Sequence, residues 1–390
     1  MGVNDRHLKI GFAPRLAALY AAFFIVAGIQ QPFFPVWLKA KGLDPGAIGI
    51  VLAMPMLLRI LAIPVVTRQA DRRDALRASI IVTSCLSVAG YVLVGLAEGA
   101  TAILTIYALA SLAFTPVMAL TETYAFKGLT ALGRAYGPVR LWGSTTFILG
   151  TFAAGFAADV IPARHLIWLI VAASLLNALA ALALAPLSTL AASGGESHGA
   201  RKPLLCDGAF LAVLAAASLI QASHAVFYGF SALEWRAAGL DGTLVAALWG
   251  LGVIAEIVLF AFSGRLPASF HPIVLLIVGA FGATLRWSAM AFDPPTVLLP
   301  FLQLLHALSF GATHLGALTY LARNAPPGQS ATAQGYLSIA LGAAMAGAMG
   351  LSGVLYASFG SLAYAAMALA AVGGGACALV AQRARGVAAH

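Results

Sequence analysis

The chain contains many predominantly apolar stretches of 18 residues or more, and their length limits how it can fold. A helix of about 20 residues crosses roughly 30 Å of hydrocarbon. Hydrophobic residues make up 61% of the sequence and charged residues only 9%, against about 25% charged in a soluble domain. The alternating ten-residue segments typical of a membrane barrel do not occur. The sequence therefore predicts an all-α polytopic membrane protein.

Twelve membrane-spanning helices are predicted from these stretches. Their expected boundaries are 15–38, 46–66, 78–97, 101–124, 138–159, 164–186, 207–234, 243–262, 272–292, 296–321, 334–357 and 361–382. Proline is tolerated inside a spanning helix when neighbours satisfy the freed carbonyl, and Pro116 is expected to interrupt the fourth span. Small residues around Gly342, Gly347, Gly350 and Gly353 in the eleventh span predict close helix packing.

One long polar stretch divides the chain into two sets of six spans. Residues 188–203 are rich in Ser, Gly and charged side chains, a composition typical of a flexible linker. The predicted organisation is therefore an N-terminal six-helix bundle at 1–187, a cytoplasmic linker at 188–205 and a C-terminal six-helix bundle at 206–390.

Basic residues alternate between the two sides of the predicted membrane. The odd-numbered connections between spans hold four Lys and Arg, whereas the termini and the even-numbered connections hold sixteen. Cytoplasmic segments carry the excess of Lys and Arg, so both termini are expected to be cytoplasmic, in an inner membrane. This placement accounts for the net charge of +9 without nucleic acid as a partner. The apolar N-terminal run lacks a small-residue cleavage site and is interpreted as the first span.

The two halves of the chain resemble each other weakly. The segment Trp37–Asp44 ends the first span, and the similar segment Trp235–Asp241 ends the seventh. Their aspartates lie 197 residues apart, and the same offset relates Arg59 in span two to Glu256 in span eight. Repeats of this kind are typical of transporters built from two pseudo-symmetric bundles with a binding site near the membrane midplane.

Several ionisable side chains lie deep inside predicted spans. A charge at the bilayer centre costs roughly 2.5–3.5 kcal/mol on insertion scales, so such residues are usually paired and functional. Glu256 is a candidate proton carrier, and His306 is a candidate proton relay. Arginine remains charged, so Arg286 and Arg59 are expected to bind a substrate carboxylate or to hold Glu256 ionised. A static ion pair between helices is the structural alternative.

Further polar side chains are candidates for the same site. His314 on span ten is a second candidate proton relay, and His224 on span seven is a candidate ligand contact. For each histidine the alternative is a buried side chain that only packs. Gln30, Gln31 and Tyr228 are expected to offer neutral hydrogen bonds to a ligand, against hydrogen bonding between helices.

The loop after span two carries the motif of a known superfamily. The segment TRQADRR at 67–73 resembles the Gly-x-x-x-Asp-Arg motif of the major facilitator superfamily, with Thr67 at the glycine position. Six plus six helices around a cytoplasmic linker are also similar to that superfamily. The resemblance implies the major facilitator fold, with twelve transmembrane helices in two pseudo-symmetric six-helix bundles. It also implies that Asp71 and Arg72 control the docking of the two bundles.

Other segments resemble the lactose-permease-like proton symporters. The run PFFPVWL in the first span is similar to their first-helix signature. Glu122 and Arg140 are similar to their helix-four carboxylate and helix-five arginine, which implies a substrate-contacting pair; a salt bridge near the surface is the alternative. Arg286 and His306 are similar to their helix-nine arginine and helix-ten histidine. A proton-carrying glutamate follows that histidine by three residues in the family, and Ser309 stands at this position here.

Three segments resemble the phenylpropionate permease group of the superfamily. They are YGFSALEWRAAGL, LWGLGVIAEIVLFAFSGRL and YGPVRLWGS, at 228–240, 248–266 and 136–144, and the similarity runs over nearly the whole chain. The chain is identified as a member of this group. Membership implies proton-driven import of a small aromatic carboxylate by alternating access, with protons and the lipid bilayer as partners and without a cofactor.

Other functions on this fold stay open, namely a proton symporter of nucleosides or sugars and an exporter of drugs or metabolites. A membrane-embedded enzyme would need a motif such as HExxH, GxSxG or GxxxxGK[ST], and none occurs, so no catalytic residue is predicted. The three cysteines have no metal-ligand spacing, and no metal site is predicted. No feature implies an oligomer, and a monomer is expected.

Overall fold

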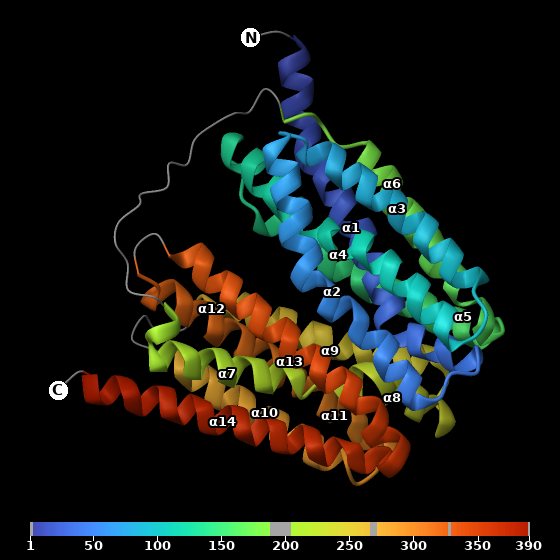
Figure 1. The fold of residues 1–390 in the computed structure, drawn as a ribbon, viewed down its shortest axis with the longest axis vertical. Helices are drawn as coiled ribbons and strands as arrows, with labels where there is room; N and C mark the ends of the chain where they lie inside the picture. The colour runs from blue at the N-terminus through green and yellow to red at the C-terminus, as the bar shows by residue number, and fades with distance from the viewer. Residues whose placement is uncertain (1–2, 188–203, 266–270, 327–328, 389–390) are drawn as a thin grey trace. The chain divides into compact units, whose positions relative to one another are not determined.

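The computed structural model describes residues 3–187, 204–265, 271–326 and 329–388, and their regular elements are helices (Figure 1). Eleven helical stretches in this part of the chain are long and apolar enough to cross a membrane. The last of them contains two helices, α13 (Ser330–Phe359) and α14 (Ala363–Ala388), because the chain turns at Gly360, whose φ is +56°. The stretches therefore accommodate the twelve predicted spans.

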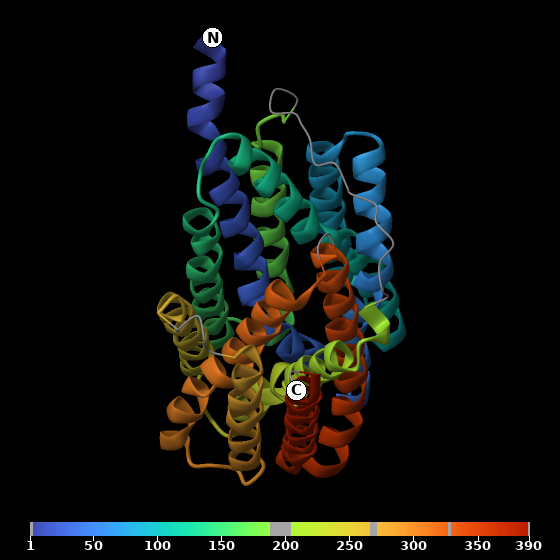
Figure 2. The ribbon, with the colours of Figure 1, turned by 90° about the vertical axis from the view of Figure 1, so that its left-hand side faces the viewer.

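The helices form two compact units, of which unit 1 consists of Met1–Ser193 and Trp235–Ala247. Its long helices are α1 (Val3–Ala40), α2 (Pro45–Arg72), α3 (Leu76–Leu96), α4 (Ala100–Ala131), α5 (Gly137–Val160) and α6 (Ile167–Leu182). α1 packs along α5, and α4 packs on α2 and α3, while α3 lies beside α6 (Figure 1). In Figure 2 the N-terminal end of α1 extends beyond the other helices of unit 1.

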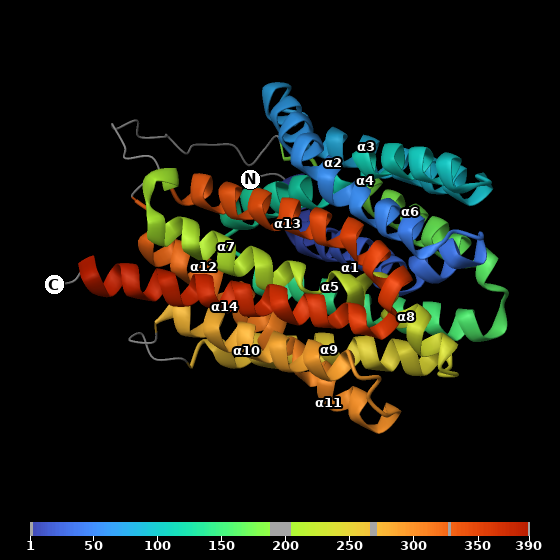
Figure 3. The same cartoon turned by 60° about the horizontal axis from the view of Figure 1, so that its bottom comes forward.

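Unit 2 consists of Gly194–Glu234 and Leu248–His390. Besides α13 and α14 it draws on α7 (Gly208–Ala222), α8 (Ala225–Ala237), α9 (Gly242–Ser263), α10 (Pro272–Met290), α11 (Leu299–Leu304) and α12 (Thr313–Asn324). α7 lies beside α13 and α14, and α14 lies beside α10 (Figure 3). The predicted linker residues 188–203 lie outside the described residues, and the predicted domain division stays a prediction.

Glycine allows α1 and α5 to approach each other closely. A Cβ atom added to Gly28 would lie 2.1 Å from the carbonyl oxygen of Phe147, and one added to Gly150 would lie 2.7 Å from that of Ile25. The Thr151 hydroxyl donates a hydrogen bond of 2.9 Å to the Gly28 carbonyl across this contact. Small residues and hydroxyl hydrogen bonds of this kind join helices in a membrane, where apolar side chains gain little from leaving lipid.

One expectation about the helices is wrong. α4 runs without interruption past Pro116, and in the preceding turn the Thr115 hydroxyl donates to the Ser111 carbonyl at 2.8 Å. The close packing expected around Gly342, Gly347, Gly350 and Gly353 is not found at two of these positions, because a Cβ atom added to Gly347 or Gly350 would meet no atom within 4 Å among the described residues. Gly342 and Gly353 are buried.

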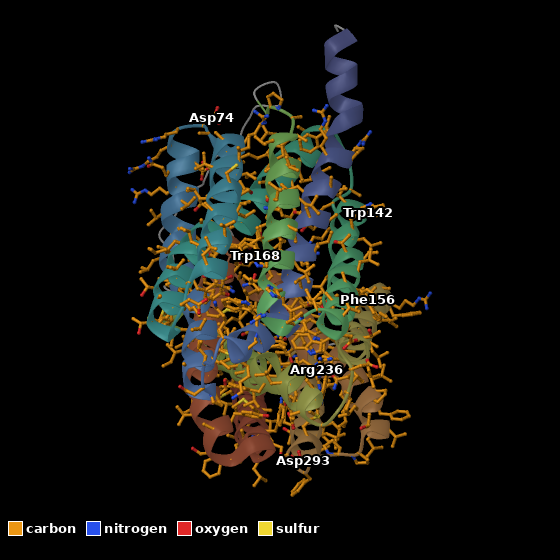
Figure 4. The ribbon with its side chains drawn as sticks, turned by 90° about the vertical axis from the view of Figure 1, so that its right-hand side faces the viewer. Asp74, Trp142, Phe156, Trp168, Arg236 and Asp293 are labelled. Atoms are coloured by element: carbon orange, nitrogen blue, oxygen red, sulfur yellow. The ribbon has the colours of Figure 1, made fainter. Side chains whose placement is uncertain are left out.

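Large apolar side chains cover the outer surface of unit 1. Trp142 and Phe156 on α5 and Trp168 on α6 project outward (Figure 4). Their exposed fractions are 56%, 63% and 40%. Such a surface would be unfavourable in water and suits contact with lipid chains.

Asp159, at the end of α5, holds the corner between α8 and α9, which belongs to unit 1. It accepts hydrogen bonds from the backbone N–H groups of Gly242 at 2.6 Å and Thr243 at 3.0 Å. The Arg236 guanidinium, which Figure 4 labels, also binds this carboxylate. A carboxylate at the first turn of a helix satisfies unpaired N–H groups and opposes the positive end of the helix dipole.

Candidate functional site

Three of the predicted side chains meet inside unit 2. Arg286 on α10 places Nη1 3.1 Å from Nδ1 of His306, and Nε2 of the same imidazole lies 3.7 Å from Oε2 of Glu256 on α9. Guanidinium groups only donate hydrogen bonds, so Nδ1 accepts and the neutral ring carries its proton on Nε2, toward Glu256. The imidazole therefore connects a cation to a carboxylate.

Arg286 is fully buried. Its Nη2 donates to Oε1 of Gln303, and the rings of Phe227 and Trp287 each lie 4.5 Å from the centre of the guanidinium. Within the described part of the chain, Nε of Arg286 and Nε2 of Gln303 have no hydrogen-bond partner, and no carboxylate forms an ion pair with Arg286. A buried cation is costly unless it is paired, so this arrangement would be stabilised by an anionic ligand.

The helix changes its geometry beside this cluster. α11 ends at Leu304, and residues Ala307–Ala312 form one π-helical turn before α12 begins. The Gln221 side-chain amide donates to the Phe310 carbonyl within this turn at 3.3 Å. π-helical turns have one residue more per turn than an α-helix and occur frequently at functional sites. The turn follows His306 directly, and so helps to set the direction of the imidazole.

His224 is a fully buried histidine with its hydrogen bonds satisfied. Its Nδ1 lies 3.2 Å from the Ile220 carbonyl and 3.1 Å from the Gln221 carbonyl, so this nitrogen donates. Nε2 then accepts from the Ser309 hydroxyl at 3.1 Å. Ser309, which stands where the related symporters have a glutamate, thus supports a histidine. The His224 ring lies edge-on to His306, with 5.5 Å between the centroids.

Aromatic side chains surround the buried arginine. Phe227 stacks on Trp249 with centroids 4.7 Å apart, and the predicted ligand contact Tyr228 lies 5.9 Å from the Trp249 ring. The other predicted relay, His314, stacks against Phe310 with 6.0 Å between the centroids. The cluster therefore combines a cation with flat apolar surfaces.

A second predicted pair meets in unit 1. The Tyr136 hydroxyl lies 2.8 and 2.7 Å from the two carboxylate oxygens of Glu122 on α4. Arg140 on α5 is more distant, with 3.9 Å between its Nε and Oε1 of Glu122. The Arg140 guanidinium lies over the ring of Phe24, 4.2 Å from its centroid. Tyr136 was not among the predicted residues, because which partner Glu122 takes depends on how the chain returns between α4 and α5.

The remaining candidates in unit 1 lie apart from that pair. Gln30 is held by two tyrosines: it donates to the Tyr107 hydroxyl at 2.6 Å and accepts from the Tyr91 hydroxyl at 2.8 Å. Gln31 is half-buried on the same helix. Arg59 on α2 contacts the Met56 sulfur, with 3.9 Å between Nη1 and Sδ. Gln30 therefore forms hydrogen bonds between helices, the alternative to ligand binding that the sequence left open.

The gating motif lies at the end of α2. Asp71 forms an exposed ion pair of 3.7 Å with Lys127 of α4, and Arg72 is exposed. The neighbouring Asp74, labelled in Figure 4, has a φ of +46° in the turn to α3. This geometry lies within unit 1 alone, so the role of Asp71 and Arg72 in docking the bundles stays a prediction.

The fold and these sites have the features of a major facilitator transporter, and comparison with known proteins identifies the family. The model of the MFS_1 like family matches residues 14–366, and the chain belongs to this family. The chain is 32% identical to the "Probable 3-phenylpropionic acid transporter" of Escherichia coli (strain K12), with 92% of this chain and 94% of that protein covered. It is 26% identical to the "Maltose permease" of Geobacillus stearothermophilus, with 80% of each covered.

Solved transporters have the same fold. The nucleoside transporter NupG aligns with a TM-score of 0.79 at 15% identity, covering 97% of this chain and 98% of that one. A bacterial homologue of the human lysosomal transporter Spinster aligns with a TM-score of 0.73 at 15% identity, covering 95% and 96%. The predicted major facilitator fold is thus confirmed, and the protein is a secondary transporter of this superfamily, not an enzyme.

Proposed function

We propose that this transporter is a proton-coupled symporter that imports a small aromatic carboxylate, such as 3-phenylpropionate, by alternating access. The observation that carries the proposal is Arg286, a fully buried cation between aromatic rings with no carboxylate paired to it among the described residues. A carboxylate can bind a guanidinium through two parallel hydrogen bonds. An aryl group can pack against the neighbouring rings. The name of the Escherichia coli relative, a probable 3-phenylpropionic acid transporter, supports the same substrate class.

Proton coupling is assigned to the series Arg286, His306 and Glu256. In the empty site the Arg286 guanidinium donates to Nδ1 of His306, which opposes protonation of that nitrogen. A bound carboxylate neutralises the guanidinium, and a proton on Glu256 or His306 then becomes less costly. Anion and proton are thereby favoured together, which is the requirement of symport. His314 is the alternative relay, and Arg140, Arg59 and Tyr228 are further proposed ligand contacts.

The coupling is tested by Glu256→Gln in proteoliposomes supplied with external radiolabelled 3-phenylpropionate. A glutamine keeps the shape of the side chain but carries no proton, so we expect accumulation driven by a pH gradient to be lost. Exchange of internal for external substrate should persist in part. Glu98→Gln is the matched control, because Glu98 is an exposed carboxylate paired with Lys41, and it should accumulate substrate normally. Accumulation by Glu256→Gln against a gradient would show that Glu256 is not the coupling residue.

The competing functions give different results in the same vesicles. A nucleoside or sugar symporter would acidify the vesicle lumen when given its neutral substrate and would not respond to 3-phenylpropionate. An exporter would carry substrate into the lumen only in vesicles where the protein is inserted in the opposite orientation. The change in lumenal pH on adding 3-phenylpropionate, compared with its neutral amide, therefore tests substrate and coupling together.

A further inference from the structure

Glu122 and Arg140 have opposite charges and lie close together, yet they do not form a tight ion pair. The shortest approach between them is 3.9 Å, from Nε to Oε1. Both oxygens of the carboxylate instead lie within 2.8 Å of the Tyr136 hydroxyl. Hydrogen bonds to a charged group are among the stronger ones in proteins, so the tyrosine competes effectively with the arginine for the carboxylate.

The terminal nitrogens of the Arg140 guanidinium are not engaged in hydrogen bonds with the described residues. Nη1 and Nη2 make no hydrogen bond to any described residue, and the group rests on the face of Phe24. Gly143, one helical turn along α5, provides the space: a Cβ atom added there would lie 2.9 Å from Nη1 and 2.7 Å from the Phe24 ring. Two terminal nitrogens on one side of a planar guanidinium match the two oxygens of a carboxylate.

We infer that Tyr136 is a positioning residue that keeps Arg140 available for an anionic substrate by holding Glu122 away from it. The inference rests on the proposed function, which includes Arg140 among the further proposed contacts of the anionic substrate.

The surroundings of Tyr136 favour a hydroxyl that always donates its hydrogen bond to Glu122. Tyr136 lies in the turn between α4 and α5, with its ring stacked on Phe126 at 4.8 Å and edge-on to Tyr20 at 6.2 Å. Burial and the hydrogen bond to Glu122 raise the pKa of Tyr136 to about 12. The hydroxyl therefore stays protonated at physiological pH and continues to donate to Glu122.

The test compares Tyr136→Phe, Glu122→Gln and the double variant in the purified full-length protein. Two quantities are measured: the dissociation constant of 3-phenylpropionate, and the reactivity of Arg140 toward phenylglyoxal, followed by mass spectrometry of its peptide. Without the hydroxyl, Glu122 should turn to Arg140, weakening binding by about tenfold and reducing modification. Removing the negative charge of Glu122 in the Tyr136→Phe background should restore both. Tyr336→Phe, a tyrosine of α13 in unit 2, is the matched control.

The double variant decides between the possible roles of Tyr136. Rescue by Glu122→Gln supports positioning, because neither a direct contact between Tyr136 and substrate nor a purely structural role would be restored by it. Weak binding that persists in the double variant overturns the inference, as does unchanged Arg140 reactivity in Tyr136→Phe. Failure of the unmodified protein to bind 3-phenylpropionate would contradict the proposed substrate, while the phenylglyoxal reaction would still decide the role of Tyr136.

Discussion

At the scale of single residues, Arg286 should be sensitive even to a substitution that keeps its charge. Arg286→Lys leaves a cation but removes the planar group that reaches His306 and Gln303 at once and stacks on two rings. We expect the affinity for 3-phenylpropionate to fall at least about tenfold, because the lysine ammonium is a compact charge and cannot offer a carboxylate the two parallel donors of a planar guanidinium. Ligand at about 100 times its dissociation constant should stabilise the unmodified protein by about 2.7 kcal/mol, and the same ligand concentration should stabilise a variant with tenfold weaker affinity by only about 1.4 kcal/mol.

Thermal unfolding with and without ligand provides the measurement for Arg286→Lys. Arg134→Lys is a suitable control, since Arg134 is exposed in the turn between α4 and α5, and its ligand-induced stabilisation should match that of the unmodified protein. An Arg286→Lys protein that still binds with normal affinity would mean that Arg286 is not the anion-binding group.

At the scale of helices, the sequence predicted the spans better than it predicted their irregularities. The length of an apolar stretch is enough to indicate a membrane span, because the thickness of the hydrocarbon core fixes how many residues a helix needs to cross it. The π-helical turn after His306 depends on contacts such as that of Gln221 with the Phe310 carbonyl, which join distant parts of the chain. Arg286 and His306 were both candidates from the sequence, whereas Gln303, which accepts a hydrogen bond from Arg286, was not. Its side chain becomes informative only when α10 and α11 are adjacent.

Glycines that look alike in sequence should differ in their effect on helix packing. Gly28→Ala places a methyl group against the backbone of α5, which cannot move aside as a side chain can. We expect its free energy of unfolding to fall by about 1–3 kcal/mol, because α1 and α5 must separate. Gly347→Ala on α13 meets open space and should change stability by less than about 1 kcal/mol. Equal unfolding temperatures for the two variants in detergent would contradict the close α1–α5 contact.

At the scale of the whole molecule, the distribution of charge predicts how the protein lies in the membrane. Sixteen basic residues on one side against four on the other predict that both termini are cytoplasmic. This orientation can be tested with two matched variants, Ala238→Cys and Ala135→Cys, at exposed positions in turns predicted to face opposite sides. Cys85, Cys206 and Cys377 are replaced by serine in both.

A maleimide that cannot cross membranes should then label Ala238→Cys in intact cells, because its turn is predicted to face outward. Ala135→Cys should react only after the membrane is permeabilised. The reverse pattern would invert the topology and with it the direction of import proposed for the substrate. Labelling of both variants in intact cells would contradict a single orientation.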